Sequence, residues 1–281
     1  MKFGMSFVNT GPAVTGKGAA ALAVAAEQAG FDSLWTVEHV VVPAGYESPY
    51  PYSRSGKMAG GVEDFDLPDP LVWLAYVAAV TETILLGTGI VILPQRNPVI
   101  LAKAAASLDV LSGGRVVLGV GAGWLAEEFA ALGVPFEDRG ARTDEYITAM
   151  RELWTDGPSN HQGDYVSFAD VYSRPLPIQR PIPIVVGGHS KRAARRAGEL
   201  GDGFFPNGAS HELVGELIVH ARHCAEEAGR DPAALEITVG SKPDAATIER
   251  WAEVGVDRVV IGNIGEDGVR IFGDQVIPAF R

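Results

Sequence analysis

The sequence has one cysteine in 281 residues, no long apolar run and no excess of basic residues. The single thiol, Cys224, excludes an internal disulfide framework. No stretch approaches the roughly 20 apolar residues that cross a bilayer. The first residues carry one lysine and too short an apolar core for a signal peptide. We therefore expect a cytoplasmic protein with no membrane partner.

Basic residues are in the minority. Asp and Glu outnumber Lys and Arg by 35 to 23, which gives a net charge of −12. Because proteins that bind nucleic acid need a basic surface, the composition argues against such a partner and leaves a small molecule as the expected substrate. Hydrophobic residues make up 47% of the chain, enough for a sizeable core.

Several familiar catalytic motifs are also missing. The sequence has no H-E-x-x-H, Walker A or G-x-S-x-G motif. His220, His223 and Cys224 stand at helical spacing but match no zinc pattern, so we expect no metal. The run GVGAGW at 119–124 resembles a dinucleotide loop, but Trp124 takes the last glycine position. It predicts instead a floor of small residues that a flat ligand can approach.

Strand-like and helix-like segments alternate from end to end. Strands are predicted at 2–8, 32–37, 84–92, 115–121, 181–187, 201–208, 235–240 and 257–263. Helices are predicted at 16–29, 69–82, 97–111, 124–133, 141–155, 190–200, 210–229 and 244–254. Strands that are apolar on both faces suit a covered parallel sheet. Eight such units favour a (β/α)8 TIM barrel over an open doubly wound sheet. No composition shift marks a second domain, so we expect one domain over 1–281.

Two segments interrupt this alternation. Residues 156–180 contain HQGDYVSF, which predicts a short hairpin. Residues 40–68 are rich in Pro, Tyr, Gly and Ser and follow the second strand. In a barrel they would lie over the face that carries catalytic groups, as a lid. A disordered excursion is the alternative, although Tyr46, Tyr50 and Tyr52 argue against it.

A polar pair, Glu38 and His39, ends the second strand. Barrel enzymes keep catalytic groups just past the carboxyl ends of strands. An imidazole can donate or accept a proton near neutral pH, and Glu38 could orient it or contact a cofactor. The alternative is that both are ordinary loop residues.

Two glycine motifs mark further strand positions. GTG at 87–89 lies inside the third strand, where glycine indicates either the approach of a ligand or packing against a bulky neighbour. In VVGGHSKRAARR at 185–196, a strand ends in two glycines and a helix starts near Ser190. Free N–H groups and the helix dipole there suit a phosphate, and the cationic side chains that follow are Lys191, Arg192, Arg195 and Arg196. A solvated helix face is the alternative.

Together these segments resemble one family. The similarity lies in SLWTVEH (33–39), LLGTGIVILPQRNP (85–98), LAKAAASLDVLSGGRVVLGVGAGW (101–124) and VVGGHSKRAARRAGELGDGFFP (185–206). They resemble the bacterial luciferase-like superfamily and, within it, the actinobacterial oxidoreductases that use the deazaflavin coenzyme F420. The resemblance implies a (β/α)8 barrel with a flavin or deazaflavin at its C-terminal face. It also implies a non-proline cis peptide between Gly89 and Ile90, behind the cofactor ring.

The resemblance also assigns roles to residues. His39 would lie beside the reactive ring face, with Glu38 as the acidic residue before it. The cofactor would contact the positions Gly89, Ile90, Ala122, Gly187, Gly188, His189, Ser190 and Arg192. Trp124 stands where the sugar-phosphate dehydrogenases of the family carry a glutamate that acts as an acid, so that activity is not expected. Trp124 and Tyr50 would instead line the site of a different, more hydrophobic substrate.

These observations predict an F420-dependent oxidoreductase that transfers a hydride between the coenzyme and a small organic substrate. One alternative is an FMN-dependent monooxygenase of the same fold, because both cofactors offer a phosphate and a tricyclic ring. The longer anionic tail of F420 and the cationic run 191–196 favour F420. Another alternative is a non-catalytic flavin-binding protein, against which the polar pair and the lid argue. Many members of the superfamily are homodimers, and we expect the same here.

Overall fold

In the computed structural model, which describes residues 1–53, 55–58, 61–208 and 210–281, eight parallel strands close into a barrel. The strands are β1 (Lys2–Ser6), β2 (Ser33–Thr36), β3 (Leu85–Thr88), β5 (Val116–Gly121), β8 (Ile184–Gly187), β9 (Gly203–Phe205), β10 (Glu236–Ser241) and β11 (Arg258–Ile261). Their order is β3-β2-β1-β11-β10-β9-β8-β5, and β3 pairs again with β5 to close the ring. The expectation of a TIM barrel is confirmed.

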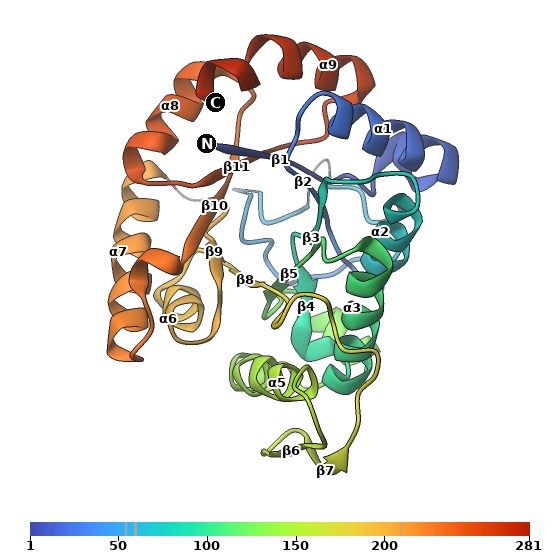
Figure 1. Cartoon of the computed structure of the whole chain (residues 1–281), viewed down its shortest axis with the longest axis vertical. Helices are drawn as coiled ribbons and strands as arrows, with labels where there is room; N and C mark the ends of the chain where they lie inside the picture. The colour runs from blue at the N-terminus through green and yellow to red at the C-terminus, as the bar shows by residue number, and fades with distance from the viewer. Residues whose placement is uncertain (54, 59–60, 209) are drawn as a thin grey trace.

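Helices surround the strands (Figure 1). They are α1 (Gly16–Gln28), α2 (Pro70–Ala78), α3 (Pro98–Ser112), α4 (Ala126–Ala131), α5 (Arg139–Leu153), α6 (Lys191–Leu200), α7 (His211–Glu227), α8 (Ala245–Val254) and α9 (Gly265–Gln275). Short 3-10 turns occur at Gly11–Val14, Leu93–Gln95, Pro232–Ala234 and Ile277–Phe280. Among the described residues, no helix is both long and apolar enough to cross a membrane.

The helix starts follow from local sequence. Asp69 accepts hydrogen bonds from the N–H groups of the first turn of α2, and Asn97 does the same for α3. In both cases proline follows as the first helical residue, where its missing N–H costs nothing. The Ser190 hydroxyl accepts from Ala193 N–H at 3.2 Å and caps α6. These three starts fall where the sequence predicts them.

The barrel interior explains the first glycine of the GTG motif. Trp35 is fully buried inside the barrel and donates its indole N–H to the Ser33 hydroxyl at 2.8 Å. A Cβ at Gly87 would lie 2.7 Å from the Trp35 ring. Gly87 is therefore a packing glycine, whereas Gly89 reaches a cavity described below.

The third strand is broken by the peptide between Gly89 and Ile90, which is cis as expected. The strand resumes as β4 (Val91–Ile92) and pairs with β5. A Cβ at Gly119 would lie 1.8 Å from the Thr88 carbonyl oxygen, and one at Gly121 would lie 2.7 Å from the Ile90 side chain. The predicted small-residue floor is therefore wrong as a ligand surface, because the glycines of β5 make room for the chain's own bulge.

Other differences from the predicted elements have simple causes. The strand predicted at 181–187 begins only at Ile184, and the one at 201–208 ends at Phe205, because Pro183 and Pro206 lack an N–H for the ladder. Helix α9 is not predicted because of its glycines. A Cβ at Gly273 would lie 2.5 Å from the Ala29 carbonyl oxygen, so this glycine lets α9 approach the end of α1.

Both interrupting segments are placed by the fold. The predicted hairpin exists as β6 (Ser159–Gln162) paired antiparallel with β7 (Ser167–Val171). In the segment 40–68, residues 54, 59 and 60 lie outside the described part. Tyr46 is buried, and its hydroxyl accepts from Met58 N–H at 2.9 Å. The described part of 40–68 therefore packs as an ordered lid rather than as a disordered excursion.

Candidate active site

A cavity of about 580 Å³ opens at the carboxyl ends of the barrel strands, under the lid. Six strand ends (those of β1, β2, β3, β5, β8 and β9) and the lid contribute to it. Its lining residues are Phe7, Thr10, Val37, Glu38, His39, Tyr50, Tyr52, Met58, Val62, Phe65, Leu67, Gly89, Ile90, Ile92, Trp124, Gly187, Gly188, Phe205 and Asn207. The walls are mainly apolar, with few groups that can exchange a proton. Such a pocket at the C-terminal face is the expected place of chemistry in this fold.

His39 is held by a carboxylate that the sequence did not single out. Its Nδ1 lies 3.0 Å from Oε2 of Glu128, whose side chain is fully buried. The other oxygen of Glu128 accepts from the N–H groups of Val40 and Val41 at 2.6 and 3.3 Å. A carboxylate can only accept here, so Nδ1 carries a proton in this pair. The ring nitrogen left to meet a ligand in the cavity is Nε2.

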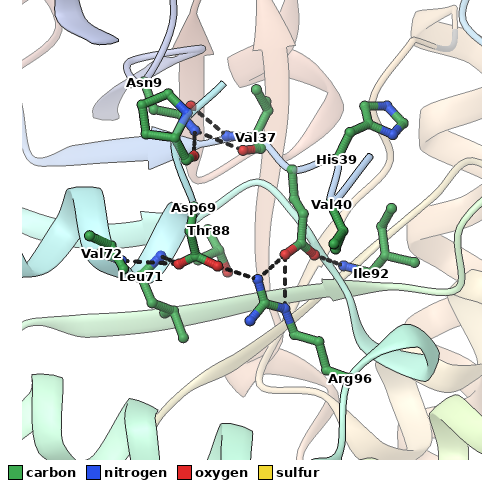
Figure 2. Close-up of polar contacts among 12 residues, drawn as sticks. Asn9, Val37, His39, Val40, Asp69, Leu71, Val72, Thr88, Ile92 and Arg96 are labelled. Atoms are coloured by element: carbon green, nitrogen blue, oxygen red, sulfur yellow. Dashed lines mark hydrogen bonds and ion pairs between the residues drawn. The ribbon is translucent and has the colours of Figure 1, made fainter. Parts of the chain in front are cut away.

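Glu38 takes part in a separate network (Figure 2). Its carboxylate accepts from Arg96 Nε at 2.8 Å and from Ile92 N–H at 2.5 Å. Arg96 also donates to Asp69 at 2.8 Å, and in Figure 2 the ring of His39 points away from this group. Glu38 therefore does not orient His39, although it lines the cavity. Its bond to Ile92 N–H instead joins β2 to the strand beyond the cis peptide.

Burial decides the ionisation of this network. Burial raises the pKa of Glu38, and the charge and hydrogen bonds of Arg96 oppose that rise. Burial also acts on Asp69, but the hydrogen bonds from Arg96 and from the first turn of α2 hold its pKa below the usual value. Arg96 thus opposes the effect of burial on both carboxyls.

The start of α4 anchors the lid. Glu127, next to Glu128, accepts from Glu47 N–H at 2.7 Å and from Ser48 N–H at 3.0 Å. The Ser48 hydroxyl and these N–H groups lower the pKa of Glu127 to about 2. Two successive carboxylates therefore tie residues 39–41 and 47–48 to the same turn of helix.

An aromatic wall, defined as Trp124, Tyr50 and Tyr52, runs along one side of the cavity. Trp124 meets the His39 ring edge-on, with centroids 5.9 Å apart, and Tyr50 at 5.1 Å. Tyr50 contacts Tyr52 at 5.3 Å, and Tyr52 contacts His189 at 5.1 Å. Burial raises the pKa of Tyr50, so its hydroxyl stays neutral. The wall links the imidazole at one end to the Gly187–Ser190 turn at the other.

The phosphate site predicted at the turn before α6 is only partly as expected. Gly187 and Gly188 line the cavity, and His189 Nδ1 is buried with no partner among the described residues. Lys191 and Arg192 are exposed at the first turn of α6. Burial and the nearby charge of Arg192 lower the pKa of Arg139, which places two cations close together.

The rest of the cationic run faces elsewhere. Arg195 donates to Asp144 at 2.8 Å and also pairs with Glu199. Arg196 is buried and pairs with Asp144. These two arginines join α6 to α5, so two of the four cations that follow the predicted phosphate turn are engaged in ion pairs.

The structure thus brings together most of the residues singled out from the sequence. His39, Glu38, Gly89, Ile90, Gly187, Gly188, Trp124 and Tyr50 all line the cavity. Ala122, His189, Ser190 and Arg192 are not among the described lining residues. Glu128 and Arg96 were missed. An acidic residue in the first turn of the helix after the fourth strand was the available signal for Glu128. Within the described residues, no group of His, Cys, Asp and Glu is arranged to hold a metal ion.

Known proteins resemble the chain along most of its length. It is 32% identical over 267 residues to an uncharacterised protein of Mycobacterium tuberculosis, covering 93% of this chain and 92% of that protein. It is 35% identical over 234 residues to an F420-dependent glucose-6-phosphate dehydrogenase of Gordonia bronchialis, covering 79% of this chain and 64% of the dehydrogenase.

A solved structure has the same fold. An F420-dependent secondary alcohol dehydrogenase, in complex with an F420-acetone adduct, superposes with a TM-score of 0.81. The superposition covers 100% of this chain and 99% of the dehydrogenase, at 21% identity. The sequence model described as luciferase-like monooxygenase matches residues 1–254. The chain belongs to the luciferase-like monooxygenase family.

Proposed function

We propose that the protein is an F420-dependent oxidoreductase that transfers a hydride between the deazaflavin and a small organic substrate. The observation that carries the proposal is the buried Glu128–His39 pair, which presents one imidazole nitrogen to an apolar cavity. The F420-dependent relative at 35% identity supports the choice of coenzyme. His39 would exchange through Nε2 the proton that accompanies the hydride.

The residues of the cavity fit such a coenzyme. The Gly89–Ile90 bulge and the Gly187–Gly188 turn offer backbone surfaces to a planar ring. A Cβ at Gly188, where φ is 122°, would lie 3.1 Å from Ala193. The unpartnered His189 Nδ1 and the exposed Lys191 and Arg192 offer donors to a phosphate at the start of α6. Bound there, the deazaflavin would supply the hydride chemistry.

The chain's own residues would then orient and protect the reaction. Trp124 holds the His39 ring edge-on and, unlike a carboxylic acid, transfers no proton at neutral pH. His39 is consequently the proton-exchanging residue of the cavity in this proposal. The mainly apolar lid keeps water from the ring and favours a hydrophobic substrate.

The test is a single-turnover experiment with a matched variant. Protein loaded with reduced F420 is mixed with a panel of small ketones and aldehydes, and oxidation of the coenzyme is followed by absorbance. At least one compound should oxidise it, and His39→Ala should slow that turnover by about 10²–10⁴-fold. Unchanged turnover in His39→Ala would remove the proton role. A protein that binds F420 but oxidises it with no compound would behave as the non-catalytic carrier.

The second candidate is an FMN-dependent monooxygenase, which the description of the family itself favours. It predicts that reduced FMN, rather than F420, supports oxygen consumption coupled to product formation. A deazaflavin lacks the N5 atom and is therefore not expected to activate oxygen. Substrate-coupled oxygen consumption with FMN, together with no oxidation of reduced F420 by any compound, would select this alternative.

We also propose that the protein is a cytoplasmic homodimer. Helices α2 and α3 pack beside each other (Figure 1). Both carry exposed apolar side chains. Val72 is 68% exposed on α2, and Ile100 and Leu111 are 70% and 77% exposed on α3. Exposed apolar patches of this kind mark protein contacts. A second copy of the chain, related by two-fold symmetry, would cover this patch on α2 and α3. Light scattering should give the mass of a dimer for the wild type and of a monomer for Val72→Lys with Leu111→Lys.

A further inference from the structure

A second cavity, of about 490 Å³, adjoins the first at the same end of the barrel. It lies at the carboxyl ends of β1, β9, β10 and β11. Its lining residues are Ser6, Phe7, Phe205, Asn207, His211, Gly240, Ser241, Lys242, Thr247, Arg250, Trp251, Val260 and Gly262. Phe7, Phe205 and Asn207 line both cavities, so one ligand can extend from the first into the second.

The second cavity differs in charge from the rest of the acidic chain. All its titratable lining residues are basic: His211, Lys242 and Arg250. No ion pair involves Lys242 or Arg250 within the part of the chain that the structure describes. Asp244, two residues from Lys242, uses both carboxylate oxygens to cap α8 through Thr247. The charges of Lys242 and Arg250 act on the nearby carboxylates Asp244 and Glu212, but neither cation forms an ion pair with them in the described residues.

Two buried ring nitrogens in the same wall have no hydrogen-bond partner among the described residues. Trp251 is 5% exposed, and its indole Nε1–H has no partner among the described residues. His211 stacks on Trp251 with centroids 3.8 Å apart, and its buried Nε2 also lacks a partner. A buried N–H without an acceptor costs free energy, which a ligand oxygen can recover. The two rings and the two cations thus line the same cavity.

Phe7 and Asn207, at the boundary between the two cavities, have unusual local geometry. Phe7 adopts a left-handed backbone with φ of 58°, which is unusual for a bulky residue and typical of functional sites. Its carbonyl accepts from the Thr10 hydroxyl at 2.7 Å. The Asn207 amide lies across Gly240, where a Cβ would come within 2.2 Å of its oxygen. Gly240 therefore leaves room for an amide that can meet a ligand from either cavity.

We infer that the second cavity binds an anionic group, a carboxylate or a phosphate, of the substrate whose reacting carbon lies beside His39. The inference rests on the proposed function and narrows its substrate class to organic anions with an apolar reactive part. Lys242 and Arg250 attract the anion, and Trp251, His211 and Asn207 contact its oxygens.

Indole NMR signals provide a test that needs no turnover. The Nε1–H groups of three tryptophans are already bonded and serve as internal controls: Trp35, Trp73 and Trp154. Inorganic phosphate and hexanoate are titrated at constant ionic strength against chloride, and Trp251→Phe assigns the signal. The Trp251 signal should shift saturably with at least one of the two anions. Lys242→Gln and Arg250→Gln should each weaken that binding about tenfold, whereas Arg270→Gln on α9 should not.

The titration is repeated with F420 bound, because the anionic tail of the coenzyme is the other source of such a group. Unchanged anion affinity assigns the cavity to the substrate, and lost affinity overturns that assignment. A Trp251 signal that ignores both anions, or shifts equally with chloride, also overturns it. F420 binding is recorded in the same samples, so failure of the anion site is distinguishable from failure of the proposed coenzyme.

Discussion

Replacing Glu128 by glutamine tests how His39 is controlled. The change keeps the size of the side chain but turns one carboxylate oxygen into an NH2 group. The amide oxygen can keep the bonds from Val40 and Val41 N–H, which leaves the NH2 facing His39 Nδ1. Because an NH2 group only donates there, Nδ1 must become an acceptor and the imidazole must carry its proton on Nε2.

The size of the effect follows from burial. Glu128 is fully buried, so water cannot replace its contact with His39. A hydrogen bond to a charged group contributes about 1.5–3 kcal/mol. If that interaction selects the reactive tautomer, its loss lowers kcat by about 10- to 150-fold. The unfolding free energy should fall by only about 1–2 kcal/mol, since the shape and the bonds to the lid remain.

The assay combines turnover with nitrogen-15 NMR of the histidine side chains. His39→Ala identifies the His39 signals, and their positions report which ring nitrogen carries the proton. Glu127→Gln is the matched control, because the neighbouring carboxylate contacts the lid but not His39. A Glu128→Gln variant with the tautomer and the kcat of the wild type would refute this role of Glu128.

Three further predictions concern stability. Arg96→Gln leaves Glu38 buried with a weaker partner and should cost about 3 kcal/mol of unfolding free energy. Since burial raises the pKa of Glu38, this cost should shrink as pH falls and the carboxyl protonates. Urea titrations at several pH values measure it, and Arg180→Gln, which breaks an exposed ion pair, is the control. A cost that does not change with pH, or an equal cost in Arg180→Gln, would contradict the role of Arg96 as the partner of buried Glu38. The Glu127 pKa is depressed to about 2 from 4.5, so its hold on the lid is complete above pH 4.5 and is lost as pH falls through about 2. The protection factors of the amides of residues 47 and 48, which correct for the intrinsic pH dependence of exchange, should fall over that interval in the wild type and be low throughout in Glu127→Ala. Gly87→Ala overpacks the barrel and should lower the unfolding free energy by about 1–3 kcal/mol, and a fully stable variant would show that the indole beside it has room to move.

Structural features that depend on the local pattern of residues could be predicted from the sequence. Apolar strands at regular spacing predict the parallel barrel, and the capping residues Asp69, Asn97 and Ser190 locate three helix starts. The family resemblance places the cis peptide at Gly89 correctly. These features depend on neighbouring residues or on a specific motif.

Contacts between residues that are far apart in the sequence could not be predicted from local patterns. Glu128 meets His39 across 89 positions of sequence, and as part of an acidic pair it resembles a solvated helix start. The glycines of β5 looked like a ligand floor because only the fold reveals that Ile90 fills them. Arg196 looked available to a phosphate because its partner, Asp144, lies on another helix. In each case the identity of the partner, rather than of the residue, decides the role.

The central claim is that this cavity takes the deazaflavin coenzyme. Equilibrium titration of one protein preparation with F420 and with FMN, followed by fluorescence, tests it most directly. We predict saturable F420 binding that is at least tenfold tighter than that of FMN. Gly188→Ala and Arg192→Gln should weaken F420 binding, because both changes disturb the start of α6. The loss of one charge-assisted contact in Arg192→Gln should weaken it about tenfold. Tighter binding of FMN, or binding of neither, would contradict the account.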